Sequence, residues 1–292
     1  MTFSPSEVFD PLTIDLEAAL ARALERHFHG ADGDTPANLA DSIRYSLLAP
    51  GKRIRPRLSL ACAAMLGLPL EAALPPALAL EMIHCFTLIH DDLPCMDDDD
   101  FRRGKPSNHK VYGEAIALLA GDALMALSTD TYLDCAAVDP TSVIRGLKRL
   151  NWAMGPRGVM GGQAREPLLG EASTLSDLRL MHAGKTGALF SAAILMPMEL
   201  SGISEASREG QALSVFAAEL GVAFQVADDL EDGETEATTP TSILYYLPKA
   251  EARDRTIRAL QAAMDSLESI WGDRARSLNR IAGEVIRSLQ SH

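Results

Sequence analysis

The sequence has few cysteines, and this shortage excludes two kinds of protein. Four cysteines occur in 292 residues (Cys62, Cys85, Cys95 and Cys135), with no CxxC pair and no histidine at the spacing of a zinc site. A disulfide scaffold and a zinc-finger module are therefore excluded. We expect free, mostly buried thiols and a cytoplasmic protein.

Positive charge is also scarce. The chain has 27 Lys and Arg against 40 Asp and Glu, a formal net charge of −13. This balance argues against sequence-independent nucleic-acid binding, which needs a basic face. It does not exclude phosphorylated small molecules, because a divalent metal ion can supply positive charge locally.

Signals for secretion or membrane insertion are missing as well. Residues 1–10 lack the basic and apolar segments of a signal peptide. The apolar run at 187–196 ends before Pro197, which makes it too short to cross a bilayer. We therefore expect no stable membrane insertion.

Aromatic residues make up only 5 % of the chain, whereas hydrophobic residues reach 47 %, with abundant Ala and Leu. This composition favours helices over sheets, and no strand-like alternation or short repeat occurs. We predict an all-α helical bundle. The length of 292 residues allows one large domain or two, and the single domain over residues 1–292 that we expect rests on the family resemblance described below. The expected helices cover 12–28, 38–48, 58–65, 74–89, 113–127, 142–154, 175–195 and 207–232, followed by one broken or two successive helices over 250–290.

What the chain does contain is two acidic clusters, each placed directly after an apolar helical run. The first has six carboxylates within ten residues, then two arginines: Asp91, Asp92, Asp97, Asp98, Asp99, Asp100, Arg102 and Arg103. The second contains Asp228, Asp229, Glu231 and Asp232. Either cluster alone is more often a solvated acidic turn. Two of them at matching helix ends favour Mg²⁺ sites that bridge to substrate phosphates, so we expect the two ends to converge at one mouth.

Basic and polar residues at other positions could take part in anion binding. Lys52, Arg53, Arg55 and Arg57 follow Gly51 and open a helix, which is typical of an anion cradle or of a solvated helix start. His84 shares a helix face with Asp91, with Thr87 between them; it is either a substrate contact or a satisfied core histidine. Lys185 lies among apolar neighbours, and Asp122 needs a partner if it is buried. The glycine-rich stretch 155–163, expected to be a loop, follows no strand, which argues against a dinucleotide site.

At this point the sequence resembles the polyprenyl (isoprenoid) diphosphate synthases over nearly its whole length, and among them the short-chain bacterial farnesyl diphosphate synthases. The likeness rests on five segments in order: Gly51-Lys52-Arg53-x-Arg55-Pro56, Leu88 to Gly104 with its aspartates and arginines, Gly161-Gly162-Gln163, Lys185-Thr186-Gly187, and Phe224-Gln225-x-x-Asp228-Asp229-x-x-Asp232. The resemblance implies an all-α bundle around a deep apolar cavity, usually a homodimer. It implies Mg²⁺-dependent head-to-tail condensation of isopentenyl diphosphate with an allylic diphosphate, dimethylallyl or geranyl, to give farnesyl diphosphate.

The resemblance also implies roles for single residues. Asp91, Asp97 and Asp228 would hold three Mg²⁺ ions (Mn²⁺ is an alternative), and Asp92, Asp229 and Asp232 would support them. Arg102 and Lys185 would contact the allylic diphosphate; Lys52, Arg55, His84 and Arg103 would bind isopentenyl diphosphate. Thr186 and Gln225 would turn oxygen dipoles toward the developing carbocation. Phe86 would limit the length of the product, and Thr87 would be a further substrate-binding residue.

The chain departs from the family pattern at three places. The segment 233–248 contains no lysine or arginine, Gly161-Gly162-Gln163 continues to Ala164-Arg165-Glu166, and the C-terminus has no basic tail. Four hypotheses therefore stay open: a farnesyl diphosphate synthase, a geranylgeranyl diphosphate synthase, a catalytically weak or silent partner subunit of a prenyl synthase, and more remotely a class I terpene cyclase-like lyase. The residues expected at the isopentenyl site favour elongation over cyclisation, because a cyclase has no second diphosphate substrate.

Overall fold

The computed structural model describes residues 9–29, 34–136, 138–232 and 238–291, with the side chain of Asp232 also outside the description. Contacts between residues divide the chain into two compact units. We call them the smaller unit, Thr13–Pro56 with Glu71–Ala137, and the larger unit, Met1–Leu12 with Arg57–Leu70 and Val138–His292. Both are built of helices, which confirms the all-α class. The single-domain assignment stays a prediction.

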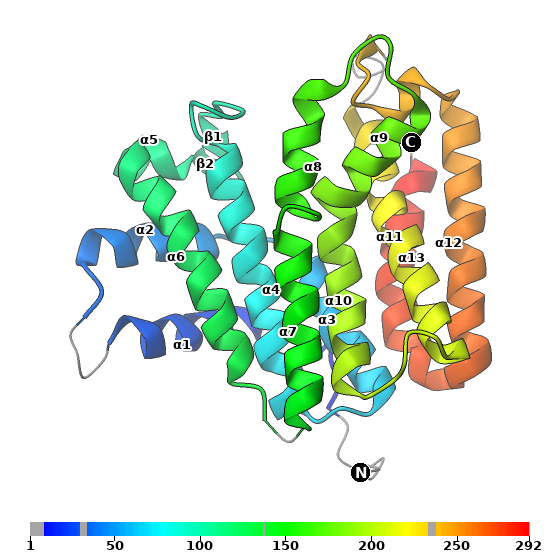
Figure 1. Cartoon of the computed structure of the whole chain (residues 1–292), viewed down its shortest axis with the longest axis horizontal. Coiled ribbons are helices and arrows are strands. Elements are labelled where there is room, and N and C mark those ends of the chain that lie inside the picture. The colour runs from blue at the N-terminus through cyan, green and yellow to red at the C-terminus, as the bar shows by residue number, and fades with distance from the viewer. Residues whose placement is uncertain (1–8, 30–33, 137, 233–237, 292) are drawn as a thin grey trace. The chain divides into compact units, whose positions relative to one another are not determined.

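The smaller unit is formed around α4 (Leu70–Asp91), whose apolar surface is buried almost all round. Its other helices are α1 (Leu16–Phe28), α2 (Ala37–Leu47), α5 (Asn108–Tyr112) and α6 (Glu114–Leu133) (Figure 1). Helices α4 and α6 approach closely at Gly121, where a Cβ atom would come within 2.1 Å of His90 Nε2. The same nitrogen lies 3.1 Å from the carbonyl oxygen of Leu118. A glycine is therefore needed where this imidazole crosses α6.

A short hairpin follows the first acidic cluster. Its strands are β1 (Phe101–Arg102) and β2 (Lys105–Pro106), paired antiparallel. Within the described residues these are the only strands, and the sequence did not predict them because two-residue strands leave no alternating pattern. Arg103 and Gly104, which form the turn, both have positive φ angles, 54° and 75°. The conformation of this turn therefore sets the directions of Arg102 and Arg103, the two arginines of the motif.

The larger unit contains the remaining helices, and Figure 1 shows α11, α12 and α13 side by side. Helix α10 packs against α7 and α11. The elements are α3 (Ile54–Leu66), α7 (Pro140–Met154), α8 (Val159–Arg165), η2 (Glu166–Leu168), α9 (Leu175–His182), η3 (Ala183–Gly187), α10 (Ala188–Leu200), α11 (Arg208–Asp232), η5 (Ile243–Tyr245), α12 (Lys249–Trp271), η6 (Gly272–Ala275) and α13 (Arg276–Ser291). The first residues of α3 still belong to the smaller unit.

Two helix predictions were wrong in this unit. The helix expected over 175–195 is interrupted by η3, a π-helical turn, and it continues past Pro197 to Leu200. The glycine-rich stretch 155–163, expected to be a loop, is helical from Val159. Its glycines allow close packing instead, because a Cβ atom on Gly162 would lie 2.0 Å from the backbone nitrogen of Lys185. Close packing here holds the π turn, and with it Lys185 and Thr186.

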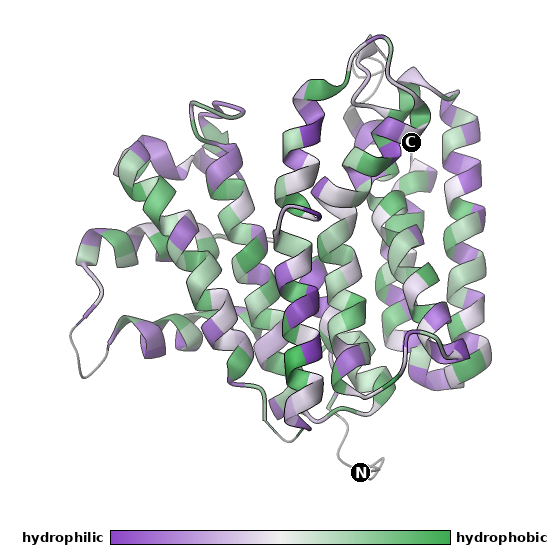
Figure 2. Ribbon diagram, in the orientation of Figure 1, coloured by the Kyte–Doolittle hydropathy of each residue, from purple (hydrophilic) through white to green (hydrophobic). Residues whose placement is uncertain are grey.

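Hydropathy differs between the helices of the larger unit (Figure 2). Nearly every residue of α10 is buried, in agreement with its uniformly apolar sequence. Helix α12 carries both hydrophilic and hydrophobic residues and buries one stripe (Leu260, Met264 and Leu267). This is an amphipathic pattern, and α12 begins one residue before the segment 250–290 in which the sequence predicted one or two helices.

Among the described residues, three helices are long and apolar enough, by length and composition, to cross a membrane: α4, α6 and the Arg208–Glu231 part of α11. None of these three helices was singled out from the sequence, where the run at 187–196 was considered. In α4, 78 % of the apolar window is buried inside the protein, against 39 % in α6. Helix α6 thus leaves much of its apolar surface exposed.

Candidate active site

The first acidic cluster begins where α4 ends. Asp91 is the last residue of α4, and the chain then turns so that the backbone N–H of Asp97 donates to the carbonyl oxygen of Asp91 at 2.9 Å. Asp91 is partly exposed and Asp97 is exposed. The turn thus brings the two predicted metal ligands of this motif together on a solvent-facing edge.

The second aspartate of this motif has a different environment. Asp92 is 2 % exposed, and Arg102 donates to its Oδ1 from Nε at 2.8 Å and from Nη2 at 2.5 Å. Arg102 also donates to Asp99 at 2.7 Å. Burial raises the pKa of Asp92, while the Arg102 guanidinium opposes this shift. Asp92 therefore anchors Arg102, the residue expected to contact the allylic diphosphate.

The second motif, at the end of α11, repeats this division. Asp228 is exposed, whereas Asp229 is 4 % exposed. Asp229 accepts a hydrogen bond from Gln225 Nε2 at 2.9 Å on Oδ1, and from the backbone N–H of Ile243 at 2.7 Å on Oδ2. The buried aspartate of each pair organises its surroundings, and the other faces solvent. Asp232 ends α11, but its side chain lies outside the described part of the chain.

Thr186 and Gln225 are brought together as one hydrogen-bonded pair. The Thr186 hydroxyl, in the π turn, donates to Gln225 Oε1 at 2.7 Å. Because Gln225 donates in turn to Asp229, its orientation is set by the buried carboxylate. The lone pairs of the Thr186 oxygen are then the groups that this pair can present to a cation.

Lys185 forms an ion pair with Glu166, the residue at which the Gly161-Gly162-Gln163 segment departs from the family pattern. The two side chains are 27 % and 30 % exposed. The sequence did not indicate this contact, because the two residues lie on different elements, α8–η2 and η3. Lys185 therefore has an internal carboxylate where a diphosphate contact was expected.

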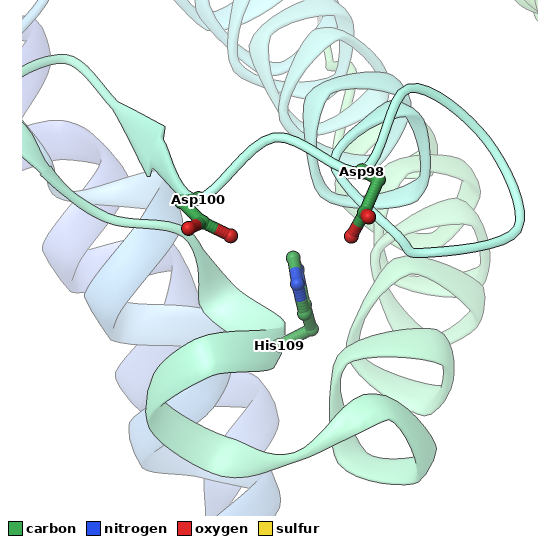
Figure 3. Close-up of side chains that lie close together, drawn as sticks. All are labelled: Asp98, Asp100 and His109. Carbon is green, nitrogen blue, oxygen red and sulfur yellow. The ribbon is translucent and has the colours of Figure 1, made fainter.

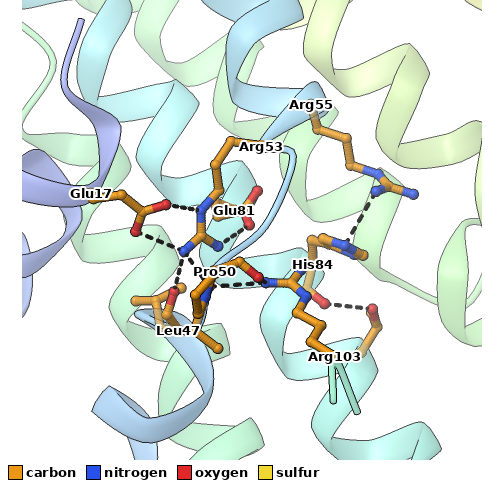
Figure 4. Close-up of polar contacts among 10 residues, drawn as sticks. Glu17, Leu47, Pro50, Arg53, Arg55, Glu81, His84 and Arg103 are labelled. Atoms are coloured by element: carbon orange, nitrogen blue, oxygen red, sulfur yellow. Dashed lines mark hydrogen bonds and ion pairs between the residues drawn. The ribbon is translucent and has the colours of Figure 1, made fainter. Parts of the chain in front are cut away.

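The basic stretch after Gly51 divides into binding candidates and structural residues (Figure 4). The Arg53 side chain is 5 % exposed and forms ion pairs with Glu17 at 2.8 Å and with Glu81 at 2.5 Å. It also donates to the carbonyl oxygens of Leu47 at 2.8 Å and Ala49 at 2.9 Å. Including Arg53 in an anion cradle was therefore wrong. Glu81, a carboxylate inside an apolar helix, was the sequence signal for this buried pair.

Arg57 also departs from the predicted cradle. It belongs to the larger unit and forms an ion pair with Glu284 at 3.1 Å. Both side chains are partly exposed, at 28 % and 39 %. Arg57 therefore tethers α3 to α13 instead of lining an anion site.

Three remaining binding candidates lie near one another in the smaller unit: Arg55, His84 and Arg103 (Figure 4). Arg55 Nη1 lies 3.3 Å from His84 Nε2. Burial, and next the charge of Arg55, lowers the pKa of His84 well below its usual value, so the ring is neutral and Nε2 accepts from Arg55. Arg103 donates to the carbonyl oxygen of Ala49 at 3.2 Å.

Gly51 explains how these groups fit together. A Cβ atom at this position would lie 2.7 Å from Arg103 Nη1, so only glycine lets the guanidinium pack over the backbone. Lys52, the next residue, is exposed. Three of the four residues predicted for the isopentenyl site, Arg55, His84 and Arg103, thus come together from segments far apart in the sequence. Thr87 supports His84 from the same helix, donating to its carbonyl oxygen at 2.8 Å.

Three further predictions concern Phe86, Asp122 and the cysteines. Phe86 is 3 % exposed and packs edge-on against His90, with the ring centroids 5.7 Å apart. Asp122 is about half exposed, and its Oδ1 lies 3.9 Å from Nε2 of His90, a basic partner when that histidine is protonated. All four cysteines are free, as predicted.

The lysine-free segment is described only in part. Residues 233–237 lie outside the described chain, and Ile243–Tyr245 forms the short helix η5. Lys249 is exposed and is the first residue of α12. The bond between Asp229 and Ile243 fixes the start of η5 to the second motif.

Comparisons with known proteins agree over most of the chain. The sequence profile named polyprenyl synthetase matches residues 36–240. The chain is 44 % identical over 220 residues to a farnesyl diphosphate synthase of Geobacillus stearothermophilus, covering 74 % of this chain and 72 % of that protein. It is also 44 % identical over 268 residues to geranylgeranyl pyrophosphate synthase 7 of Arabidopsis thaliana, covering 86 % and 77 %. The crystal structure of a geranyltransferase from Legionella pneumophila matches with a TM-score of 0.83 and 30 % identity, covering 95 % of each chain.

Proposed function

The chain belongs to the polyprenyl synthetase family, and from this premise we propose that it condenses isopentenyl diphosphate with dimethylallyl or geranyl diphosphate to give farnesyl diphosphate. The observation that carries the proposal is the arrangement of exposed and buried aspartates, which is the same in both motifs. In each motif a buried aspartate (Asp92 or Asp229) is fully engaged by the protein, and its neighbour (Asp91 or Asp228) faces solvent. A solvated acidic turn without a binding role would not require one buried and one solvent-facing aspartate in each motif.

Mg²⁺ fits the donors that the motifs present. Asp91, Asp97 and Asp228 offer carboxylate oxygens only, the ligands that Mg²⁺ prefers, and their partly or fully exposed positions leave room for water and phosphate. These three residues would hold the metal ions, three in all when substrate is bound, with Asp92, Asp229 and Asp232 in supporting positions. Bound there, Mg²⁺ would supply positive charge that stabilises the diphosphate as it leaves.

The chain's own residues would perform the other tasks. Arg102 and Lys185 would bind the allylic diphosphate by exchanging their internal carboxylates for phosphate oxygens. Lys52, Arg55 and Arg103, with the neutral His84, would hold isopentenyl diphosphate. Ionisation breaks the allylic carbon–oxygen bond, and diphosphate leaves with the electron pair. The isopentenyl double bond then attacks the allylic carbon, and the departing diphosphate takes the final proton.

Thr186 would stabilise the carbocation in this scheme. Its hydroxyl proton is directed to Gln225, so the negative end of the oxygen dipole is the end available to a cation. The deep apolar cavity that would exclude water from the cation stays a prediction.

Product length follows from Phe86 in this proposal. The buried ring lies five residues before Asp91, the position where a large side chain limits products to fifteen carbons in the family that the sequence resembles. Relatives of both product classes match the chain equally well in identity. Farnesyl diphosphate is therefore the proposed product and geranylgeranyl diphosphate the alternative.

Incubation with Mg²⁺, isopentenyl diphosphate and each allylic diphosphate, followed by chromatography of the products, tests the activity. We expect farnesyl diphosphate from the wild type. Asp91→Asn should lower turnover by orders of magnitude with an unchanged circular dichroism spectrum, because it removes one metal ligand. Asp122→Asn, an exposed aspartate on α6, is the matched control. Equal turnover in the two variants would refute the metal assignment.

A second candidate function is a silent or weakly active partner subunit. The absence of lysine and arginine over 233–248 favours it, because those side chains would otherwise help to hold the allylic diphosphate. Each lost charged contact would cost about 1.5–3 kcal/mol where it is shielded from water. Allylic diphosphate affinity should then be weak in the wild type and should rise in a chimera with a lysine-bearing loop. Lys249→Ala tests whether Lys249 offsets the loss.

The proposed assembly is a homodimer in the cytoplasm. Helix α6 exposes Leu118, Leu119 and Leu133 at 47 %, 50 % and 53 %, an apolar surface that a second copy could cover. The four free cysteines agree with a reducing compartment. Sedimentation of the wild type and of Leu119→Glu tests the dimer. A monomeric wild type that sediments with vesicles would instead assign this face to a lipid surface.

A further inference from the structure

Part of the first acidic cluster has no role in the proposed diphosphate site. Asp98 and Asp100 follow Asp97 within that cluster, and a third residue near them, His109, comes from α5. Each offers one ligand atom, and the three atoms all lie within 4.8 Å of one another. Figure 3 shows the imidazole of His109 pointing between the two carboxylates. All three residues belong to the smaller unit.

The burial of His109 is the observation that points to a ligand. The residue is only 6 % exposed, although both aspartates are exposed. Its Nε2 atom is buried and has no hydrogen-bond partner among the residues that the structure describes. A buried polar atom without a partner costs about 1–3 kcal/mol. A metal ion bonded to this nitrogen would remove that cost.

The other side of the ring is held in place. Nδ1 of His109 lies 3.1 Å from the hydroxyl oxygen of Ser107, a residue that is 1 % exposed. A hydrogen bond of this kind fixes the orientation of a histidine that ligates metal through its other nitrogen. The ring is therefore positioned before any ligand binds.

The carboxylates suit the same role. Lys110 forms an ion pair with Oδ1 of Asp100 at 2.6 Å. A carboxylate has about four acceptor positions on its two oxygens, so the lysine does not use them all. Asp98 has a φ of 52°, in the left-handed region that aspartate tolerates, and Figure 3 shows its carboxylate directed toward His109.

We propose that Asp98, Asp100 and His109 bind one divalent transition-metal ion, Mn²⁺ or Zn²⁺, at a site separate from the metal ions of the diphosphate site. One imidazole nitrogen with two carboxylates suits such ions better than Mg²⁺, which takes oxygen ligands. The ion would join the motif turn to α5. It would thereby hold both neighbours of Asp99, the residue that fixes Arg102 together with Asp92.

Mn²⁺ binding measured by electron paramagnetic resonance tests the proposal in the full-length chain. The triple variant Asp91→Asn/Asp97→Asn/Asp228→Asn serves as the background, because it lacks the proposed diphosphate-site ligands. We expect one Mn²⁺ per chain to remain, with a nitrogen coupling in the pulsed spectrum. Adding His109→Gln or Asp98→Asn should weaken binding at least tenfold and, for His109→Gln, remove the nitrogen coupling.

His29→Gln is the matched control for this experiment. His29 also lies beside two carboxylates, 3.4 Å from Glu25 and 3.0 Å from Asp34, but its side chain is 62 % exposed. Its substitution should leave Mn²⁺ binding unchanged. Absence of bound Mn²⁺ in the triple variant, or equal binding after His109→Gln, would overturn the proposal. Asp98 is exposed, so loss of folding would not explain its effect. Turnover with Mg²⁺ and diphosphates tests the proposed function separately, so either result can fail alone.

Discussion

Replacing Arg53 by methionine should strongly destabilise the protein, although Arg53 is absent from the proposed binding site. The side chains of Arg53 and Glu81 are 5 % and 2 % exposed, so the substitution leaves a carboxylate buried without its cation. Removing one partner of a buried ion pair costs about 3–5 kcal/mol. Glu17 adds little to this figure, because its side chain is half exposed. The loss should therefore follow mainly from Glu81.

The control lies four residues further along the same segment. Arg57 and Glu284 are 28 % and 39 % exposed, and an exposed pair contributes only about 0–1 kcal/mol. Urea unfolding at pH 7.5 should show Arg53→Met losing several times more free energy of unfolding than Arg57→Met. The double variant Arg53→Met/Glu81→Leu should recover part of the loss, because it replaces the pair by apolar groups. Equal losses below about 1 kcal/mol in both single variants would refute the assignment of a buried pair.

Three more predictions concern the smaller unit. Phe86→Ala should lengthen the products to twenty carbons or more, and an unchanged product distribution would show that the chain-length limit lies elsewhere. Gly51→Ala places a Cβ atom 2.7 Å from Arg103 Nη1; the guanidinium should move, raising the KM for isopentenyl diphosphate with little change in Tm, and an unaltered KM would contradict that position. Burial lowers the folded-state pKa of His84, so the unfolded chain binds more protons below its ordinary pKa of about 6.5. Stability should fall as the pH drops from 7.5 to 5.5, and His84→Gln should make that fall smaller; an identical fall in wild type and variant would refute it.

Sequence patterns predicted most of the long helices and pointed to both acidic clusters as candidate sites, because apolar periodicity and runs of aspartate are local signals. The interruption at Ala183–Gly187 was not predictable in this way, since nothing in the apolar sequence distinguishes a π turn from an α-helix. What sets it apart is the close approach of Gly162 to the backbone of Lys185. That contact joins segments that only the folded chain brings together.

The roles of the basic residues were predicted less well, and the reason is again non-local. Arg53 and Arg55 are two positions apart and look alike in the sequence. The structure gives Arg53 a buried carboxylate and Arg55 a neutral histidine. The ion pair between Lys185 and Glu166 was missed for the same reason, since it depends on how α8 packs against the π turn.

The internal ion pairs have a consequence for ligand selection. Arg102 is bound to Asp92 and Asp99, and Lys185 is bound to Glu166. Each of the two cations therefore already has a carboxylate partner when no substrate is present. An incoming anion must take the place of a carboxylate that is tethered nearby and therefore present at a high effective concentration. Inorganic phosphate or a monoester, with less charge to offer, would exchange poorly. Under the proposed function, a diphosphate that arrives with divalent cations would compensate the displaced carboxylates as it binds. These ion pairs would therefore lower the affinity of Arg102 and Lys185 for small anions such as inorganic phosphate.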